Sequence, residues 1–284
     1  MLIFVCLLYR LCYYWWAKNV NKNIKIKGII YTIPYYSSSH SILRKLRNYI
    51  IYLLFAKCKQ FDSIYLLNSN NAANYYNKLF NTKNFKYLPD PFACNESLNN
   101  IDIKKMFNID RDTIVFSQFG YLSRGKGTCE ILKCFIDLEE EYKTKTTLIL
   151  AGEVDNSIKK EFYDLVKKAE EKHVNMHIKD SFVAFDYIHA ICSVSNFILM
   201  PYECGDKSSG MFGYSSYFNV PLVASNTGLI AETVNKYKLG YCLDNINASG
   251  LNNFIKNHLN DKMSISDDYL KSHSLDVFKK EIIS

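Results

Sequence analysis

Short apolar runs alternate with longer segments in which apolar residues recur three or four positions apart. The short runs predict β-strands, and the periodic segments predict helices that cover them. This alternation is typical of βαβ units, so we predict an α/β fold with parallel sheets and helices on both faces. The predicted strands are 26–33, 61–67, 112–120, 145–151, 175–178, 197–202, 221–225 and 240–243, and the predicted helices are 41–58, 69–80, 127–142, 156–172, 184–194, 208–218, 228–237, 247–260 and 266–283.

The pattern breaks at residues 88–100, LPDPFACNESLNN, which hold two prolines and a polar cluster. Such a break is typical of a domain junction. We predict an incomplete N-terminal α/β domain over 1–92 with about three strands, a doubly wound domain over 93–262, and a C-terminal helix over 263–284.

The first sixteen residues, MLIFVCLLYRLCYYWW, are the most membrane-like part of the chain. They are interrupted by Arg10 and fall short of the roughly 20 apolar residues that a spanning helix needs. No basic segment precedes them and no small-residue cleavage site follows, which argues against a signal peptide. A buried helix is the favoured interpretation, and a helix lying in the membrane interface or a true span remain as alternatives.

The composition excludes a disordered chain, with 48% hydrophobic and 22% charged residues among 284. A formal charge of +7 suits nucleic acid, an anionic membrane surface or phosphorylated small molecules. Because the basic residues look scattered and no RNA-binding or zinc-finger signature is present, we expect no nucleic-acid partner. The nine cysteines form no CxxC pair, which indicates reduced thiols and a cytoplasmic protein.

Two loops at the carboxyl ends of predicted strands carry candidate chemistry. In the first, FSQFGYLSRGKG (116–127), a strand ends at Gly120 and a helix begins near residue 128, with Arg124 and Lys126 between them. Backbone amides, a helix N-terminus and two cations at one point are suited to binding phosphate. A basic, solvated turn is the simpler alternative, and the spacing is not that of a Walker A motif.

The second loop follows strand 197–202 and carries Asp206, Lys207 and the Ser208-Ser209-Gly210 turn before a predicted helix. A serine at the helix N-cap satisfies one exposed amide, and Gly210 lets a ligand approach the others closely. Asp206 is suited to accept hydrogen bonds from sugar hydroxyls. An ordinary capped loop is again the alternative.

The order of four motifs resembles the family 4 glycosyltransferases, which have the GT-B fold, use a nucleotide-diphosphate sugar and retain anomeric configuration. FGYLSRGKG looks like the family's Gly-Arg-Leu-x-x-x-Lys-Gly loop, and LILAGE (148–153) looks like its next strand and turn. NFILMPYE and SSGMFGYSSYFNVPLVAS look like the donor-sugar loop and helix, and TGLIAETV (227–234) looks like the Gly-x-x-x-Glu loop near the nucleotide. The resemblance covers roughly residues 60–262.

The resemblance implies roles for individual residues. Lys126 would contact the donor diphosphate as a catalytic residue, with Arg124 as a helper and Gly120 shaping the loop. The amides of Ser208, Ser209 and Gly210 would hold phosphate and sugar. Asp206 would contact the transferred hexose, since it stands at the first Glu of the family's Glu-x7-Glu motif, and Glu232 would lie near the nucleotide.

The chain departs from the family pattern in three features. Tyr121 replaces the usual loop Arg, and Tyr214 replaces the second Glu, although one branch of the family reads Ser-Ser-Gly and lacks that Glu. The family also normally has a strand, a glycine-rich loop and about 80 to 100 further residues before the segment that matches 26–33. The resemblance therefore implies a shortened acceptor-side domain here.

We predict a hexosyltransferase that moves a sugar from a nucleotide-diphosphate donor to a polysaccharide or lipid-linked acceptor with retention. It would work in the cytoplasm, at the inner face of the membrane if it makes a peripheral membrane contact. No cofactor is expected, and no Asp-x-Asp pair or His cluster argues for a metal. The alternatives are a non-catalytic nucleotide-sugar-binding remnant or subunit and a generic phosphate-binding α/β protein.

Overall fold

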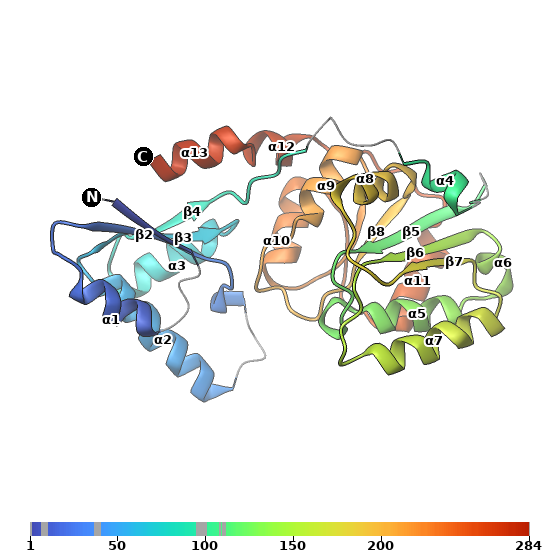
Figure 1. The fold of residues 1–284 in the computed structure, drawn as a ribbon, viewed down its shortest axis with the longest axis horizontal. Coiled ribbons are helices and arrows are strands. Elements are labelled where there is room, and N and C mark those ends of the chain that lie inside the picture. The colour runs from blue at the N-terminus through green and yellow to red at the C-terminus, as the bar shows by residue number, and fades with distance from the viewer. Residues whose placement is uncertain are drawn as a thin grey trace.

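The chain forms two α/β domains joined by extended segments (Figure 1). The computed structural model describes residues 2–6, 11–36, 41–94, 101–107, 109 and 112–283. The predicted junction is extended from Pro89 to Cys94, and its residues 95–100 lie outside the described residues.

The N-terminal domain is built on a four-stranded parallel sheet in the order β1-β2-β3-β4, one strand more than predicted. Side chains of β3 alternate between its faces, with Ile64 and Leu66 in one apolar cluster and Tyr65 and Leu67 in another. Both faces are therefore buried. The elements are β1 (Leu2–Cys6), α1 (Leu11–Asn19), β2 (Lys25–Ile30), the 3₁₀ helix η1 (Pro34–Tyr36), α2 (Ile42–Lys57), β3 (Phe61–Leu67), α3 (Asn70–Phe80) and β4 (Phe85–Leu88).

The first sixteen residues do not form one helix, so that prediction is wrong. Leu2–Cys6 is strand β1, which pairs in parallel with β2, and a helix begins only at Leu11. Periodicity cannot distinguish a short buried strand from a helix when every position is apolar. Within the described residues, no helix has the length and hydropathy that crossing a membrane requires.

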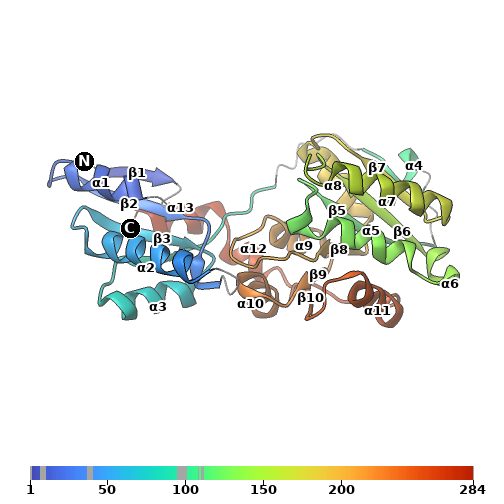
Figure 2. The same cartoon turned by 90° about the horizontal axis from the view of Figure 1, so that it is seen from below.

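The C-terminal domain contains a six-stranded parallel sheet in the order β10-β9-β8-β5-β6-β7. One apolar cluster fills the face that carries α8, α9 and α12, and a second fills the face that carries α5, α7 and α11 (Figure 2). The strands are β5 (Ile114–Phe119), β6 (Thr146–Ala151), β7 (Met176–Lys179), β8 (Phe197–Met200), β9 (Leu222–Ser225) and β10 (Gly240–Leu243), and the helices are α4 (Ile103–Met106), η2 (Arg124–Lys126), α5 (Thr128–Ile136), α6 (Glu140–Lys143), α7 (Lys159–Glu171), α8 (Phe185–Val194), α9 (Met211–Phe218), α10 (Gly228–Tyr237), α11 (Ala248–His258), α12 (Asp268–Ser272) and α13 (Leu275–Ile283).

All the predicted strands are present, and the α/β class is confirmed. Strand β4 was not predicted because its four residues, FKYL, are too few and too mixed to give a pattern. The predicted helix 127–142 is two helices, α5 and α6, and Leu138 between them is buried. The predicted helix 266–283 is likewise split into α12 and α13.

The C-terminal helix α13 returns to the N-terminal domain and covers the second face of its sheet (Figure 1). Phe278 and Ile282 pack against that face. The Lys27 ammonium donates a hydrogen bond of 2.6 Å to the Ile282 carbonyl, and the Tyr65 hydroxyl donates one of 2.8 Å to the Glu281 carbonyl. The end of the chain therefore ties the two domains together.

His273, between α12 and α13, makes this connection sensitive to acid. It is fully buried, stacks on Tyr269 at 3.8 Å and lies 3.2 Å from the Tyr87 hydroxyl. Burial lowers the pKa of His273 to about 4, so the unfolded chain takes up a proton at higher pH than the folded chain does. We therefore expect this contribution to the free energy of unfolding to be fully present above pH 6.5. As the pH falls toward 4, the free energy of unfolding should decrease by up to about 3 kcal/mol.

Urea unfolding at pH 7 and pH 4.5 measures this loss. The His273→Gln variant should show a smaller difference between the two pH values than the wild type. His258→Gln, which removes a histidine at the surface, should keep the wild-type difference. Equal acid sensitivity in wild type and His273→Gln would contradict the assignment.

Candidate functional site

The strand order of the C-terminal sheet brings the two predicted loops together. Strands β9, β8, β5 and β6 are consecutive neighbours, so the loops that follow them meet at one edge of the sheet. The Glu203 N–H donates a hydrogen bond of 3.0 Å to the Gly125 carbonyl, which joins the loops after β8 and β5. The Leu229 N–H donates one of 2.7 Å to the Gly205 carbonyl, which joins the loops after β9 and β8.

The loops after β5 and β6 approach too closely for side chains. A Cβ atom on Gly152 would lie 1.5 Å from the Gly120 carbonyl oxygen, and Gly152 has a φ of +152°. Gly120 itself has a φ of +88°. Only glycine allows both this close approach and these positive φ angles. We call the two turns at Gly120 and Gly152 the floor of the site.

Lys126 is a half-buried cation on this floor. Its Nζ lies 3.5 Å from the point where a Cβ on Gly120 would stand and 5.6 Å from the centroid of the Tyr202 ring. Among the described residues, no carboxylate forms an ion pair with Lys126. Burial lowers the pKa of its amine, which means that a bound anion would gain more there than at an exposed lysine.

Buried polar contacts hold the Lys126 backbone in place. The Gln118 side-chain amide donates to the Lys126 carbonyl at 2.8 Å, and the Thr128 hydroxyl donates to the Gln118 carbonyl oxygen at 2.7 Å. Gln118 and Thr128 are fully buried. The ammonium is thus carried on a rigid turn at the start of α5.

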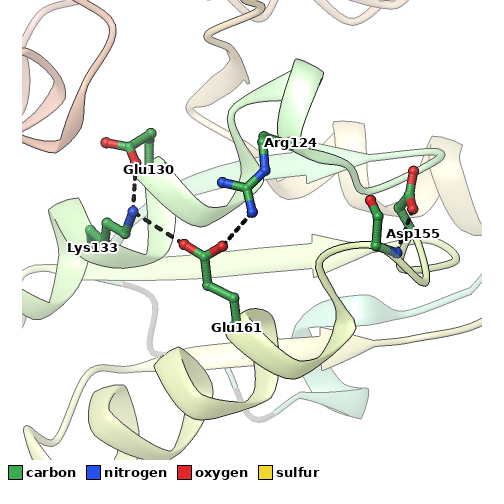
Figure 3. Close-up of polar contacts among 6 residues, drawn as sticks. Arg124, Glu130, Lys133, Asp155 and Glu161 are labelled. Carbon is green, nitrogen blue, oxygen red and sulfur yellow. Dashed lines mark hydrogen bonds and ion pairs between the residues drawn. The ribbon is translucent and has the colours of Figure 1, made fainter.

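Arg124, predicted beside Lys126, faces a different direction. Its guanidinium forms an ion pair of 2.6 Å with Glu161 of α7, and Glu161 also lies 3.3 Å from Lys133 (Figure 3). Lys133 pairs in turn with Glu130 at 2.8 Å. The structure therefore separates the two predicted cations, leaving Lys126 at the sheet edge and Arg124 in a surface ion-pair network.

An apolar pocket of about 310 Å³ adjoins this floor. The side chains of Phe182 and Phe185 lie in it although they are 82% and 69% exposed. Exposed aromatic rings around a small pocket are suited to hold a flat ring of a ligand. Our sequence reasoning missed these phenylalanines, although their place just after β7 was a usable signal. The pocket is lined by Gly120, Tyr121, Gly152, Glu153, Phe182, Val183, Phe185 and Ile188.

Asp206 lies where the loop after β8 meets the N-terminal domain. Its carbonyl accepts a hydrogen bond of 2.7 Å from the Ile33 N–H, and the next residue, Lys207, forms an antiparallel bridge with Thr32. Asp206 is nearly buried. The residue predicted to contact the sugar therefore lies between the domains.

We had predicted that Ser208 caps a helix. Its side chain instead contacts the N-terminal domain. Its hydroxyl accepts a hydrogen bond of 2.7 Å from the Asn68 side chain at the end of β3, and it also bonds to Asp90 in the linker. Asn68 in turn accepts a hydrogen bond from the Asp90 N–H at 2.7 Å. Burial raises the pKa of the Asp90 carboxyl. Neither Asn68 nor Asp90 was predicted as a site residue.

Ser209 and Gly210 form the entry to α9. The helix begins at Met211, and its N–H donates to the Ser209 hydroxyl at 3.4 Å. A Cβ on Gly210 would meet no atom within 4 Å, so the space over this helix start is open. The positive end of the helix dipole lies at this point and favours an anion. These residues keep the geometry on which the prediction relied.

Glu232 lies on α10, the helix that Figure 2 shows next to the N-terminal domain, and its side chain contacts that domain. The Tyr36 hydroxyl donates a hydrogen bond of 2.6 Å to the Glu232 carboxylate and lies 2.6 Å from the Ser69 hydroxyl. Burial raises the pKa of Tyr36, and the bond to Glu232 raises it further. Tyr36 was not predicted from the sequence.

The two tyrosines that depart from the family motifs differ in position. Tyr214 is buried and contacts Phe92, Phe119 and His189, so it serves the core beneath α9. Tyr121 is exposed at the pocket rim and bonds to Asp155, which lies to the right of the ion-pair network in Figure 3. Among the described residues, no group of three His, Cys, Asp or Glu side chains is arranged to hold a metal ion.

The sequence matches no protein-family model, and no curated protein matches it. Solved structures do match. The UDP-forming trehalose-phosphate synthase of Burkholderia xenovorans, in complex with glucose-6-phosphate, is 10% identical with a TM-score of 0.74, and 99% of this chain and 73% of that chain are covered. Anabaena Alr3699/HepE, in complex with UDP and glucose, is 14% identical with a TM-score of 0.69, covering 92% and 71%.

WaaG, a glycosyltransferase involved in lipopolysaccharide biosynthesis, is 14% identical with a TM-score of 0.65, covering 96% of this chain and 78% of that chain. At these identities the likeness shows the fold and not the activity. Membership of family 4 and retention of configuration stay predictions. The match over nearly the whole chain, with its two parallel sheets and returning C-terminal helix, shows that this protein has the GT-B fold of glycosyltransferases.

Proposed function

We propose that this protein transfers a hexose from a nucleotide-diphosphate sugar to a glycan or lipid-linked acceptor with retention of configuration. The observation that carries the proposal is Lys126, a half-buried ammonium with no carboxylate partner among the described residues, at the meeting point of the loops. A cation in such a place gains most from an anionic ligand.

The contacts around Lys126 favour one placement of the donor. The diphosphate would lie between the Lys126 ammonium and the N–H groups of Ser209 and Gly210 at the entry to α9, over the open space at Gly210. The base would lie between Phe182 and Phe185 in the pocket next to Gly120. The sugar would then extend toward Asp206 and the N-terminal domain, where an acceptor must approach.

This placement accounts for the chemistry of transfer. Breaking the bond between the anomeric carbon and the phosphate oxygen builds negative charge on the leaving diphosphate and positive charge on the sugar ring. Lys126 and the amides of Ser209 and Gly210 would stabilise the leaving group, and the Asp206 carboxylate would orient the sugar hydroxyls. Such fixed charges lower the barrier because they need no rearrangement when the bond breaks.

The solved structures of similar fold add support. HepE binds UDP and glucose, and a UDP-forming trehalose-phosphate synthase shares the same arrangement of elements. We therefore favour a uridine nucleotide as donor. WaaG acts in lipopolysaccharide biosynthesis, which agrees with a polysaccharide or lipid-linked acceptor.

A second candidate is a protein that binds a nucleotide sugar without transferring it. Buried Tyr214 favours it, because no carboxylate replaces the second Glu of the family motif at that position. Backbone contacts between Asp206 and Ile33 also place the loop against the N-terminal domain, where an acceptor would enter.

Thermal-shift titration of the full chain with UDP, GDP and their glucose conjugates tests the proposal. We expect one nucleotide to raise the melting temperature, by an amount set by RT ln(1 + [L]/Kd). Mass spectrometry of the bound conjugate with a glycolipid acceptor mixture then measures transfer. Binding without product supports the second candidate, and a folded protein that binds none of the four ligands contradicts both.

A further inference from the structure

The positive charge of the chain is concentrated in its first part, which corrects our view of it as scattered. Residues 1–61 hold ten Lys and Arg residues and no Asp or Glu. The other 25 basic residues are outnumbered by the 28 acidic residues that follow. The N-terminal domain is therefore the basic part of a chain whose remainder is slightly acidic.

The first half of α2 exposes apolar side chains to solvent. Ile42 and Leu43 are 84% and 80% exposed, and Leu46, Tyr49 and Ile50 are exposed as well. Figure 1 shows this end of α2 projecting beyond the rest of the domain. An exposed apolar residue is ordinary when it stands alone, but five within nine positions of one helix are not.

These side chains form one stripe that faces away from the core. At about 100° per residue, the exposed apolar residues of α2 fall within an arc of about 120°. Three buried residues of the same helix, Ile51, Tyr52 and Phe55, fall on the opposite side, and buried Ala56 falls just beyond one edge of the stripe. Helix α2 thus has two apolar faces, and folding of this chain buries only one of them.

A groove of about 610 Å³ continues the exposed face onto α3. On the α3 side it is lined by Tyr75 and Leu79, which are 46% and 41% exposed. Lys78 is exposed on the same helix. We call the exposed apolar residues of α2 and α3 together the α2–α3 face; they are Ile42, Leu43, Leu46, Tyr49, Ile50, Tyr75 and Leu79.

Basic residues accompany the stripe. Arg47 and Lys45 lie at its two edges on the helix, and Arg44 lies behind it; all three are exposed. No acidic residue is present anywhere in α2 or α3. An apolar stripe bordered by Lys and Arg is complementary to an anionic lipid surface, because the apolar side chains enter the acyl boundary while the long cations reach the headgroups.

We propose that the α2–α3 face binds an anionic membrane surface and holds the N-terminal domain against the bilayer. This inference goes beyond the proposed function and does not depend on it. It assigns membrane contact to α2 rather than to residues 1–16, where the sequence alone had suggested it. With the acceptor-side domain on the membrane, the junction at Asp206 and Tyr36 would receive substrates from a lipid surface.

Co-sedimentation of the full chain with vesicles tests this proposal. We expect binding to phosphatidylcholine vesicles that contain 30% phosphatidylglycerol, weakened by salt, and much weaker binding to phosphatidylcholine alone. The triple variant Leu43→Ser, Leu46→Ser, Ile50→Ser should bind at least tenfold more weakly. The double variant Lys45→Gln, Arg47→Gln should lose about 25-fold, since each basic residue near an anionic surface contributes roughly fivefold.

The matched control is helix α4, where Lys104, Lys105 and Met106 are exposed. Lys104→Gln, Lys105→Gln, Met106→Ser removes two charges and one apolar residue and should bind vesicles like the wild type. Vesicle binding that is absent in the wild type, or unchanged in both α2 variants, would overturn the proposal. So would a dimer in sedimentation velocity that the serine variant dissociates, because the face would then bind a second copy. Nucleotide titration of the same samples is a separate readout, so the proposed function can fail while this inference stands.

Discussion

Replacing Lys126 with Met is expected to reduce kcat/KM for sugar transfer by about 100- to 1000-fold. This is the loss produced by removing one fixed group that stabilises charge in the transition state, about 2.7 to 4 kcal/mol. Met keeps much of the apolar stem and removes the ammonium. Because burial lowers the pKa of Lys126, the charge is costly in the empty protein, and we expect the variant to melt at the same temperature or slightly higher.

The ion-pair network in Figure 3 supplies the controls. Lys133→Met removes a cation that pairs with Glu130 and Glu161 on the far side of the loop, and it should change kcat/KM less than threefold. Arg124→Met should have a smaller effect than Lys126→Met, because Glu161 already neutralises that guanidinium. Full activity in Lys126→Met would place the donor diphosphate elsewhere. Equal losses in all three variants would indicate a disrupted loop.

Replacing Gly152 with Ala is expected to destabilise the protein by about 3 kcal/mol or more. The added Cβ would lie 1.5 Å from the Gly120 carbonyl oxygen, and the φ of +152° is one that L side chains rarely adopt. The backbone must move, since no flexible side chain is available to yield. Movement of Gly120 would displace the turn that carries Lys126, so nucleotide binding should be lost in any protein that folds.

Gly125→Ala is the matched substitution in the neighbouring turn. A Cβ there would meet no atom within 4 Å, so we expect a change of at most about 0.5 kcal/mol and unchanged binding. Differential scanning fluorimetry and nucleotide titration of both variants measure the difference. A Gly152→Ala protein that melts and binds like Gly125→Ala would show that the two loops are not in contact in solution.

Much of the fold could be predicted from the sequence because buried parallel strands are continuous apolar runs. Runs such as TTLILA and FILM are apolar throughout, and the helices between them keep a regular period, so strands β5 to β10 were all predicted. Strand β1 was mistaken for part of a helix because its neighbours are equally apolar. Strand β4 was missed because only two of its four residues are buried.

Only part of the candidate site could be predicted from the sequence. Loops at the carboxyl ends of neighbouring strands must meet, so the sequence could predict that Lys126, Gly120 and Ser209 lie at the same edge of the sheet. The residues of the N-terminal domain that contact these loops could not be predicted. Tyr36, Asn68 and other N-terminal residues contact Glu232 and Ser208 only because the domains dock, and no local pattern encodes a contact between residues more than 130 positions apart.

The sequence by itself determined the parallel α/β architecture, the two loops and the glycines, because each follows from local periodicity or from the steric demands of one turn. The tertiary structure alone decided which cations are free to bind a ligand. Arg124 and Lys126 are two positions apart and chemically similar, yet packing of α7 pairs one with Glu161 and leaves the other half-buried at the sheet edge. It likewise decided which apolar face of α2 enters the core, since a helix can show two such faces and only docking against a sheet buries one.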